Sequence, residues 1–487
     1  MKLSELFSST SLSISANHDP DVTAVTPDPD KCAVGSVYVC IKGLTRDGHD
    51  GVGKAIKNGA VAVVTSQSRH DVTILSKKLG IPCAECENTR SAYSILISRL
   101  YSDPHKSLHI TAVTGTNGKT TTVALLKAIY TAAGCSCRTI GTLDGGLTTP
   151  DPDILYPALA SFRDSGITHV FMEASSHALS LNKLEPIAFD NAVFTNLTSE
   201  HLDFHSTMED YARAKARLFP RSRRSFINTD SEYASVMIAA SVNHVLCSAL
   251  KGDADVSARN IRLNGSQGVS YDTFIGNGAF RIESPMPGAH TVMNTLEAAA
   301  CAYYDGISHR TIRYAIKNLR SVKGRLERLP LPTSDYAVYV DFAHTPDALK
   351  ALLTTVRSFM KDGQRLVLLF GCGGDRDRTK RPIMGSIASS LSDFVIITSD
   401  NCRTEPCSSI IADILSGFDH DCPHTVIEDR RLAIEFAVSN ALDGDVIVLA
   451  GKGHEEYQIT NNGTLPFSER QIVLDTVRQC MKGRGQF

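Results

Sequence analysis

The chain alternates short, continuously apolar runs with longer stretches in which apolar residues recur at helical spacing. The apolar runs lie at residues 37–41, 61–64, 110–113, 170–172, 192–194, 336–340, 366–370, 394–398 and 446–450. Stretches such as 91–101 and 123–133 have the helical spacing. Continuous apolar runs are typical of parallel strands that are covered on both faces. The pattern therefore predicts an α/β protein.

A glycine-bearing loop follows the apolar run at 110–113 and precedes the predicted helix at 123–133. Its residues are Gly115, Thr116, Asn117, Gly118, Lys119, Thr120 and Thr121. In such loops backbone N–H groups and the helix N-terminus surround a phosphate chain, the lysine reaches the terminal phosphates and the threonine binds Mg²⁺. The first glycine of the general pattern would fall at Val113, so Lys119 could also be an exposed lysine that begins a helix. The flanking strand and helix favour a variant ATP-binding loop.

Polar residues stand directly after many of the apolar runs, where the carboxyl ends of parallel strands gather ligands. Glu173 follows one run, and His201 and Lys215 follow further along the chain. Each has an ordinary alternative: a solvated carboxylate, a hydrogen-bonded histidine or an exposed lysine. After residue 330, four runs end in polar segments that begin at 341, 371, 399 and 451. They predict a second binding surface, distinct from the ATP loop.

The length of 487 residues exceeds what one hydrophobic core usually serves. We expect three domains, at residues 1–107, 108–329 and 330–487. They are an N-terminal α/β domain, a central parallel sheet like that of P-loop ATPases, and a C-terminal Rossmann-like, doubly wound sheet. Asp103-Pro104 supports the first boundary, because proline interrupts the helix before the next strand.

Charge and composition limit which binding partners and which cellular compartment we expect. The net charge is −2 and no long basic run occurs, so we expect neither nucleic acid nor an anionic membrane as a partner. No window holds the roughly 18 consecutive apolar residues of a membrane span, and we expect a cytoplasmic protein without a signal peptide. Thirteen cysteines are scattered along the chain, and Cys83-x-x-Cys86 has no second pair at zinc spacing. We expect free thiols in a reducing cytosol.

A set of motifs in a fixed order resembles the Mur ligase family over nearly all of residues 26–480. The motifs are Thr-Gly-Thr-Asn-Gly-Lys-Thr-Thr at 114–121, Thr148-Thr149, Glu173-x-Ser175-Ser176-His177, the segments 195–197 and 201–205, Ala214-Lys215, Gly288-x-His290 with Asn294, Gly324-Arg325-x-Glu327-Arg328, and the segments 341–347, 373–377, 380–382 and 451–455. Within the family, the combination is similar to the members that add a diamino acid to a UDP-N-acetylmuramoyl dipeptide.

The resemblance implies an ATP-dependent amide ligase that uses Mg²⁺. The implied nucleotide contacts are Gly115 to Thr121 of the loop together with Asn294, Arg325 and Asp341. The implied metal ligands are Thr120, Glu173, His201 and Lys215, the lysine as a carbamate. The implied catalytic residues are Lys119, Lys215, Glu173, His201 and Arg325. Carbamate formation needs a neutral amine, which desolvation favours.

The resemblance also places the UDP-substrate, with some departures from the family pattern. The implied contacts are Leu44, Thr45, Arg46, Thr148, Thr149, Ser175 and Lys183. Asp28-Pro29-Asp30 stands where the family usually has Asp-Ser-Arg, so the contacts to uracil stay open. Lys183 replaces an arginine and loses its bidentate fork, and Glu200 replaces an aspartate.

The third substrate follows from Asp400-Asn401-Cys402-Arg403, which resembles the Asp-Asn-Pro-Arg motif of members that add meso-diaminopimelate. A planar guanidinium binds the second carboxylate of diaminopimelate bidentately, whereas lysine would leave the Arg403 fork unpaired. The implied contacts are Arg376, Asp400, Asn401, Arg403, Gly451 and Glu455. The alternative is that Cys402 distorts the loop and relaxes the selectivity.

The resemblance implies an enzyme of peptidoglycan precursor synthesis, and we expect it to be monomeric and cytoplasmic. It would join meso-2,6-diaminopimelate to UDP-N-acetylmuramoyl-L-alanyl-D-glutamate through an acyl phosphate made from ATP. One alternative is the same ligase acting on L-lysine. Another is an amide ligase like folylpolyglutamate synthetase, which would not explain residues 26–60 or the motif at 400–403. A third alternative is a switch NTPase, which would hydrolyse ATP without an amine acceptor.

Overall fold

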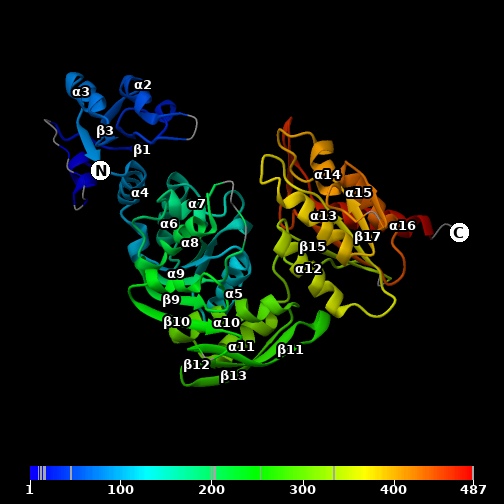
Figure 1. Ribbon diagram of the computed structural model, residues 1–487. Helices are drawn as coiled ribbons and strands as arrows, with labels where there is room; N and C mark the ends of the chain where they lie inside the picture. The colour runs from blue at the N-terminus through cyan, green and yellow to red at the C-terminus, as the bar shows by residue number, and fades with distance from the viewer. Residues whose placement is uncertain are drawn as a thin grey trace.

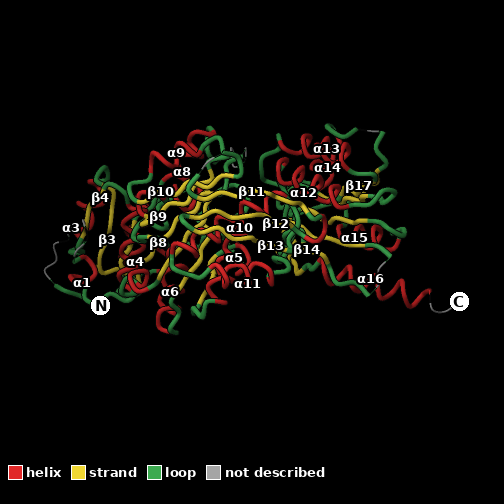
Figure 2. Tube along the Cα trace, turned by 90° about the horizontal axis from the view of Figure 1, so that it is seen from below, coloured by secondary structure: helices red, strands yellow, loops and turns green. Residues whose placement is uncertain are grey.

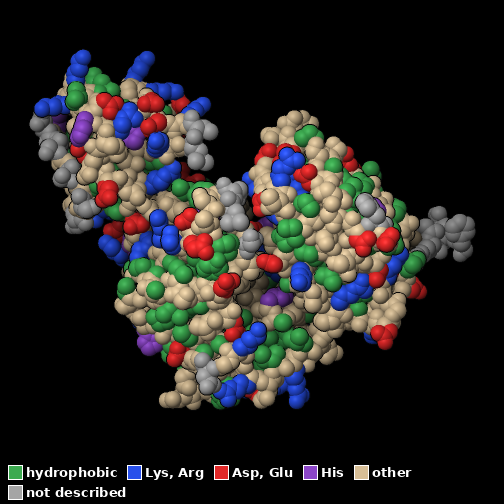
Figure 3. All heavy atoms as spheres, viewed as in Figure 1, with side chains coloured by type: hydrophobic (Ala, Val, Ile, Leu, Met, Phe, Trp, Pro, Cys, Tyr) green, Lys and Arg blue, Asp and Glu red, His purple; other side chains and the backbone are tan. Residues whose placement is uncertain are grey.

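The computed structural model describes residues 1–487 apart from 9, 11, 13, 15–17, 44–45, 199, 201–203, 253, 333–334, 420 and 485–487, and apart from the side chains of 482–484. Three large sheets follow one another along the described chain, and a two-stranded hairpin accompanies the third (Figure 1). The first and third sheets are separated from each other, and each lies next to the part of the chain that carries the second sheet. Figure 3 shows an open notch between them. Among the described residues, no helix is long and apolar enough to cross a membrane.

The first sheet is parallel, in the order β1-β2-β3-β4. Its strands are β1 (Ala24–Thr26), β2 (Ser36–Val39), β3 (Ala60–Ser66) and β4 (Cys83–Cys86), with helices α1 (Leu3–Phe7), α2 (Val52–Lys57), α3 (His70–Lys78) and α4 (Thr89–Leu100). Val37 and Val39 join one core cluster and Tyr38 joins another. Because strand side chains alternate between faces, both faces of this sheet are covered.

The second sheet has the order β13-β12-β11-β10-β9-β8-β5-β7-β6. Its strands are β5 (His109–Thr114), β6 (Cys137–Ile140), β7 (His169–Glu173), β8 (Phe189–Phe194), β9 (Ser222–Asn228), β10 (His244–Ala249), β11 (Val256–Leu263), β12 (Val269–Ile275) and β13 (Gly278–Ser284). The pairs from β6 to β11 are parallel, which confirms the predicted parallel sheet. The antiparallel strands β12 and β13 were not predicted.

Helices cover the second sheet on both sides. They are α5 (Lys119–Ala132), α6 (Pro152–Asp164), α7 (Ser176–Ser180), α8 (Met208–Ala216), α9 (Ala234–Ala240), α10 (Ala289–Tyr304) and α11 (His309–Asn318). Figure 2 shows α8 and α9 on one side of the strands and α5 and α11 on the other. Ala112 of β5 faces the first group and Val113 the second. Helix α5 begins four residues before the predicted start at 123.

The third sheet has the order β14-β15-β19-β16-β17-β18 and is parallel except for β14. Its strands are β14 (Glu327–Arg328), β15 (Ala337–Asp341), β16 (Leu366–Phe370), β17 (Phe394–Ile397), β18 (His424–Val426) and β19 (Val446–Ala450). Helices α12 (Pro346–Phe359), α13 (Lys380–Leu391) and α14 (Cys407–Leu415) pack on one face. Helices α15 (Arg430–Ser439) and α16 (Glu469–Arg484) pack on the other, which confirms the doubly wound arrangement. A hairpin of β20 (Tyr457–Thr460) and β21 (Gly463–Pro466) follows β19.

The predicted domain limits at 107 and 329 stay a prediction. Two features bear on where the parts join. One core cluster includes Val37 of the first sheet, Leu96 of α4 and Leu155 of α6, so the first two sheets share buried contacts. Strand β14 lies before residue 330 and pairs with β15.

Candidate active site

The loop between β5 and α5 has the geometry of a phosphate-binding loop. Gly118 has φ +90°, and a Cβ atom there would lie 2.5 Å from Asn294 Oδ1, so only glycine fits. Asn294 comes from α10 and is 3% exposed, which puts α10 directly against the loop. The Asn117 backbone N–H donates to Asn196 Oδ1 at 2.9 Å. The structure therefore brings the predicted loop and Asn294 together.

Two lysines meet at one carbonyl of this loop. Lys119 Nζ donates to the carbonyls of Gly115 and Thr116, each at 2.8 Å. Lys215 Nζ, from α8, donates to the same Gly115 carbonyl at 2.9 Å and is 1% exposed. Burial, with the charge of Lys119 added, lowers the pKa of Lys215 well below its usual value. Burial also lowers the pKa of Lys119. The arrangement favours a neutral amine at Lys215.

Glu173 ends β7 and lies beside the first turn of α5. The Thr120 hydroxyl donates to Glu173 Oε1 at 3.0 Å, and the side chain of Glu173 is buried. Thr142 donates to Oε1 from its backbone and to Oε2 from its hydroxyl, at 2.9 and 3.1 Å. A cavity of about 650 Å³ opens next to Thr120 and Glu173, and residues of α5 and α11 line about half of it. Neither Asn294 nor Asp341 lines it.

Arg325 connects the loop to the third sheet. Its Nη2 donates to Thr120 Oγ1 at 2.8 Å, and its guanidinium lies 4.8 Å from the centre of the Phe342 ring. Its Nε is buried and has no partner among the described residues. Asp341, at the end of β15, accepts two backbone N–H groups at 2.6 and 2.8 Å. Arg325 and Asp341, predicted as nucleotide contacts, therefore both lie where the second and third sheets meet.

A second cavity, of about 250 Å³, lies between the first sheet and α6. Asp28, Arg90, Asp151 and Lys183 are among the residues that line it. Lys183 Nζ lies 2.7 Å from Asp151 Oδ1. Arg90 Nη2 donates to the Lys42 carbonyl at 2.9 Å, and burial lowers the Arg90 pKa. The cavity thus contains Lys183 and Asp28, both considered for the UDP-substrate.

The other predicted substrate contacts are spread around the end of β7. The Thr149 hydroxyl donates to the Glu173 carbonyl at 2.8 Å and accepts from the Ser175 backbone N–H at 3.0 Å. The Ser175 hydroxyl caps α7. Thr148 is half-buried next to Thr149, and Arg46 is exposed. Leu44 and Thr45 lie outside the described residues.

A polar cluster lies at the carboxyl end of the third sheet. Asn401 Nδ2 donates to Glu455 Oε2 at 2.9 Å. Lys452, which is fully buried, donates to Asn401 Oδ1 and Glu455 Oε2, each at 3.0 Å. Asp400 is 8% exposed, and its buried Oδ2 has no partner among the described residues. Gly451 packs against Asp400, because a Cβ atom there would lie 2.7 Å from Oδ2. Four of the predicted amino-acid contacts thus lie together.

Arg403 lies at the edge of this cluster with part of its guanidinium unused. Its Nη1 donates to the carbonyls of Gly374 and Asn401, at 2.7 and 3.3 Å. Its Nε and Nη2 atoms donate to none of the described residues, so one planar edge with two donors is available. Burial, and then the positive charge of nearby Arg376, lowers the pKa of Arg403. This pair of arginines suits an anion.

Comparison with known proteins shows the family. The model of the Mur ligase middle domain matches residues 113–302, and that of the Mur ligase, glutamate ligase domain matches residues 324–453. A UDP-N-acetylmuramoyl-L-alanyl-D-glutamate–2,6-diaminopimelate ligase from Caldanaerobacter subterraneus subsp. tengcongensis is 39% identical, over 99% of this chain and 100% of its own. The chain belongs to the Mur ligase family.

Solved structures agree with this membership. A structure of UDP-N-acetylmuramoyl-L-alanyl-D-glutamate–2,6-diaminopimelate ligase is 31% identical, has a TM-score of 0.66 and is matched over 96% of both chains. Folylpolyglutamate synthase of Mycobacterium tuberculosis, complexed with ADP and AMPPCP, is 18% identical, with a TM-score of 0.62 over 81% of this chain and 95% of its own. At 18% identity this second likeness concerns the fold alone. As a Mur ligase, the chain is an ATP-dependent amide ligase.

The predicted metal ligands of this Mur ligase lie close together only in part. Thr120 and Glu173 are in contact, and Lys215 reaches the same loop through Gly115. His201 lies outside the described residues. Among the residues that the structure describes, no group of three or more His, Cys, Asp or Glu side chains could hold a metal. Thr120 and Lys215 are not of these types, so this finding leaves the predicted set untested.

Sequence reasoning missed three features of the site. Lys452 was left without a role, although a lysine between two glycines after a buried strand was a usable signal. Arg90 lies in α4, directly before the helical stretch predicted at 91–101, and nothing in its neighbourhood marks it as part of a cavity. The expectation that the cysteines are free thiols is wrong for Cys402 and Cys407, which form a disulfide; the other eleven are free. The turn after Asn401 brings the two Cα atoms to 5.6 Å, a separation that a disulfide spans.

Proposed function

We propose that this Mur ligase joins meso-2,6-diaminopimelate to the D-glutamyl carboxylate of UDP-N-acetylmuramoyl-L-alanyl-D-glutamate. The relatives of 36–39% identity that match along nearly the whole chain carry the name of this ligase, which supports the proposal. The observation that carries it is the unused guanidinium edge of Arg403 next to Asp400 and Asn401. The reaction would serve peptidoglycan precursor synthesis in the cytoplasm, and the chain would act as a monomer.

ATP would bind at the loop between β5 and α5. Phosphate oxygens would replace the carbonyls of Gly115 and Thr116 as acceptors for Lys119. Arg325 has a buried Nε without a partner, and this donor would bind a phosphate oxygen as negative charge develops. The dipeptide carboxylate would attack the terminal phosphate to form an acyl phosphate. Asn294 and Asp341 would hold the rest of the nucleotide.

The donors near the loop suit Mg²⁺. The Thr120 hydroxyl and the Glu173 carboxylate are buried and already in contact, and Mg²⁺ prefers such hard oxygen ligands. His201 and a carbamate on Lys215 would complete the set. Bound Mg²⁺ would neutralise charge on the phosphates. Glu173 is held by two hydrogen bonds from Thr142, which fix the direction of its carboxylate.

Lys215 is suited to carbamate formation because burial favours its neutral amine. The neutral amine would attack CO₂ and lose a proton, which gives a carbamate anion. Lys119 lies close to this position, because both lysines donate to the Gly115 carbonyl. The negative charge of the carbamate would attract Lys119 and a metal ion.

The substrates would meet at the notch between the first and third sheets. The cavity that contains Lys183 and Asp28 would hold the UDP-sugar, with Arg90 as an additional contact. Thr148, Thr149 and Ser175, near Glu173, would hold the peptide part. Arg46, together with Leu44 and Thr45, would contact the uridine end. The peptide carboxylate would thus point at the ATP loop.

Diaminopimelate would bind at the carboxyl end of the third sheet. The Nε and Nη2 atoms of Arg403 would bind its distal carboxylate bidentately, with Arg376 nearby. Asp400, Asn401 and Glu455 would receive its distal ammonium, and Asp400 Oδ2, which has no partner among the described residues, is free to accept from it. The free amine would then displace phosphate from the acyl phosphate to form the amide.

The test is a screen of amine acceptors with UDP-N-acetylmuramoyl-L-alanyl-D-glutamate and ATP. We expect kcat/KM for meso-diaminopimelate to exceed that for L-lysine or L-ornithine by about 10³-fold or more, because a lysine side chain leaves the Arg403 fork unpaired. Comparable values for L-lysine would contradict the proposed selectivity and favour the lysine-adding alternative. Product formed from a folate and glutamate instead would favour a folylpolyglutamate synthetase-like activity.

A further inference from the structure

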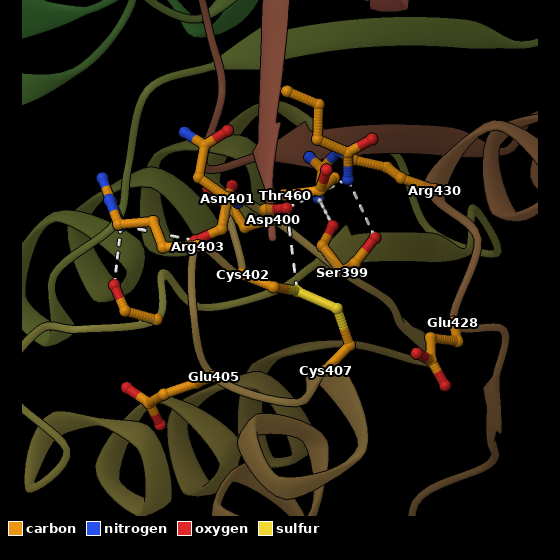
Figure 4. Close-up of a disulfide and its surroundings, with 12 residues drawn as sticks. Ser399, Asp400, Asn401, Cys402, Arg403, Glu405, Cys407, Glu428, Arg430 and Thr460 are labelled. Carbon is orange, nitrogen blue, oxygen red and sulfur yellow. Dashed lines mark hydrogen bonds between the residues drawn. A yellow bond between two sulfur atoms is a disulfide. The ribbon is translucent and has the colours of Figure 1, made fainter. Parts of the chain in front are cut away.

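One disulfide occurs among the described residues, and it closes a small ring that contains Arg403. Cys402 and Cys407 are five positions apart, and their sulfur atoms are bonded. Figure 4 shows the bond between the loop that follows β17 and the first residue of α14, with Arg403 on the loop beside it. All thirteen cysteines are described, and the other eleven are free. The disulfide is therefore specific to this loop.

Arg403 has a backbone conformation that needs support. Its φ is +53°, in the left-handed region that residues other than glycine rarely adopt. Such conformations persist where the surrounding structure constrains them. The Arg403 backbone N–H donates to the Ile459 carbonyl at 3.2 Å, and its Nη1 donates to the Gly374 carbonyl at 2.7 Å. The conformation aims the side chain at the proposed amino-acid site.

Cys402 is tightly packed at the base of this ring. Its carbonyl accepts the backbone N–H of Glu405 at 3.1 Å. A Cβ atom on Gly374 would lie 2.0 Å from the Cys402 carbonyl oxygen, so the two backbones touch. The same Gly374 carbonyl holds Arg403. A shift of Cys402 would therefore move both the Arg403 backbone and the partner of its guanidinium.

We propose that the Cys402–Cys407 disulfide is a positioning element for Arg403, and that its reduction weakens the binding of diaminopimelate. The bond would constrain the loop at the position where the Asp-Asn-Pro-Arg motif has proline, whose ring fixes φ. This inference rests on the proposed function. The planar guanidinium of Arg403 would bind the distal carboxylate of diaminopimelate through two hydrogen bonds. A small displacement of the guanidinium would therefore cost one of them.

The reduction is a thiol–disulfide exchange with a dithiol. Cys402 is 4% exposed whereas Cys407 is partly exposed, so a thiolate of the dithiol would attack the Cys407 sulfur. Cys402 would leave as a thiolate and take up a proton. The second thiol of the reagent would then displace Cys407, giving two protein thiols and an oxidised, cyclic reagent. Disulfides of cytosolic proteins are typically of this transient, redox-sensing kind.

The test compares the oxidised chain with the chain reduced by dithiothreitol, with free thiols counted by mass spectrometry after alkylation. We expect reduction to raise the KM for diaminopimelate about tenfold, the size of effect that follows from loosening one bound side chain. The KM values for ATP and for the UDP-dipeptide should stay within about twofold, because the disulfide lies at the third sheet and touches neither site. An unchanged KM for diaminopimelate, or an equal rise in all three KM values, would overturn the proposal.

Variants separate the disulfide from other effects. Cys407→Ser should have the high KM of the reduced chain and no response to dithiothreitol. The double variant C402P/C407S should regain a low KM and also lack the response, because the Cys402 backbone N–H donates no hydrogen bond among the described residues and proline removes none. Cys480→Ser, in α16, should respond as the unmodified chain does. If the oxidised chain forms no amide with diaminopimelate, the proposed function is wrong. If it forms the amide but reduction leaves the KM for diaminopimelate unchanged, only this inference is wrong.

Discussion

Arg325 Nη2 lies 2.8 Å from Thr120 Oγ1, although the two residues are 205 positions apart in the chain. Thr120 begins α5 next to the phosphate loop, and Arg325 immediately precedes the third sheet. The contact therefore ties the segment that leads to the amino-acid site to the predicted ATP site. Any rotation of the third sheet on this segment would move a cationic donor relative to the phosphates.

Replacement of Arg325 tests this link. We expect Arg325→Lys to lower kcat about 10²-fold, the effect of losing one donor that stabilises developing charge, with a smaller change in the KM for ATP. Steady-state ADP formation with all substrates is the measurement. Arg328→Lys, an exposed arginine of β14, is the matched control and should keep its activity. A normal kcat in Arg325→Lys would show that Arg325 does not stabilise the developing charge.

The carbamate proposal predicts chemical rescue. Lys215→Ala should lose about 10²-fold or more of kcat, because one proposed metal ligand disappears. Added formate or acetate should restore part of that activity by supplying a carboxylate in the space of the side chain. Arg213→Ala, an exposed position of the same helix, should keep its activity and gain nothing from formate. Full activity of Lys215→Ala without any carboxylate would refute the carbamate.

The role of Arg403 predicts a change in selectivity. Arg403→Lys keeps the charge and loses the planar fork, so we expect kcat/KM for diaminopimelate to fall about 10²-fold. The low kcat/KM for L-lysine should stay nearly unchanged. Exposed Arg431→Lys in α15 serves as the control. Equal losses for both acceptors would mean that Arg403 only stabilises the loop.

Glu297 in α10 predicts a pH dependence of stability. Its carboxyl is fully buried, neither oxygen has a partner among the described residues, and burial raises its pKa well above the usual value. The folded chain therefore keeps a proton that the unfolded chain loses above about pH 4.3. The contribution to stability is present below that pH and is lost as the pH rises toward the folded pKa.

The neutral variant Glu297→Gln should remove this loss. We expect its advantage in the free energy of unfolding to grow by about 1 kcal/mol or more from pH 5 to pH 8, since one pKa unit corresponds to about 1.4 kcal/mol. Thermal melting at both pH values measures it. Glu87→Gln, at an exposed position, should show no such trend. A difference that is the same at both pH values would contradict the assignment of a protonated carboxyl.

Buried strands were predictable because burial on both faces leaves a continuous apolar signature. Strands β16 (Leu366–Phe370) and β19 (Val446–Ala450) lie where the sequence pattern placed them. Helix α5 begins earlier than predicted, because its first turn is Lys-Thr-Thr-Thr and carries no apolar periodicity. The β12–β13 hairpin was missed although Gly276-Asn277-Gly278 is a turn signal, since its strands alternate in burial.

The sequence predicted which residues lie at the strand ends of the candidate site. It predicted few of the contacts between them. Lys119, Thr120 and Glu173 followed from the order of strand, loop and helix together with the family resemblance. The contact of Arg325 with Thr120 and the Cys402–Cys407 disulfide could not be predicted, because each depends on how the chain turns between distant elements. The resemblance supplied residue roles there, and those roles stay predictions.

The stoichiometry of ADP to amide product distinguishes a ligase from an ATPase. Purified chain is given ATP, the UDP-dipeptide and meso-diaminopimelate, and then each mixture with one substrate left out. We predict one ADP per amide bond and almost no steady ADP release in any incomplete mixture. Continuous ADP release without diaminopimelate, with no amide formed when it is added, would contradict the proposed amide formation and favour a switch NTPase.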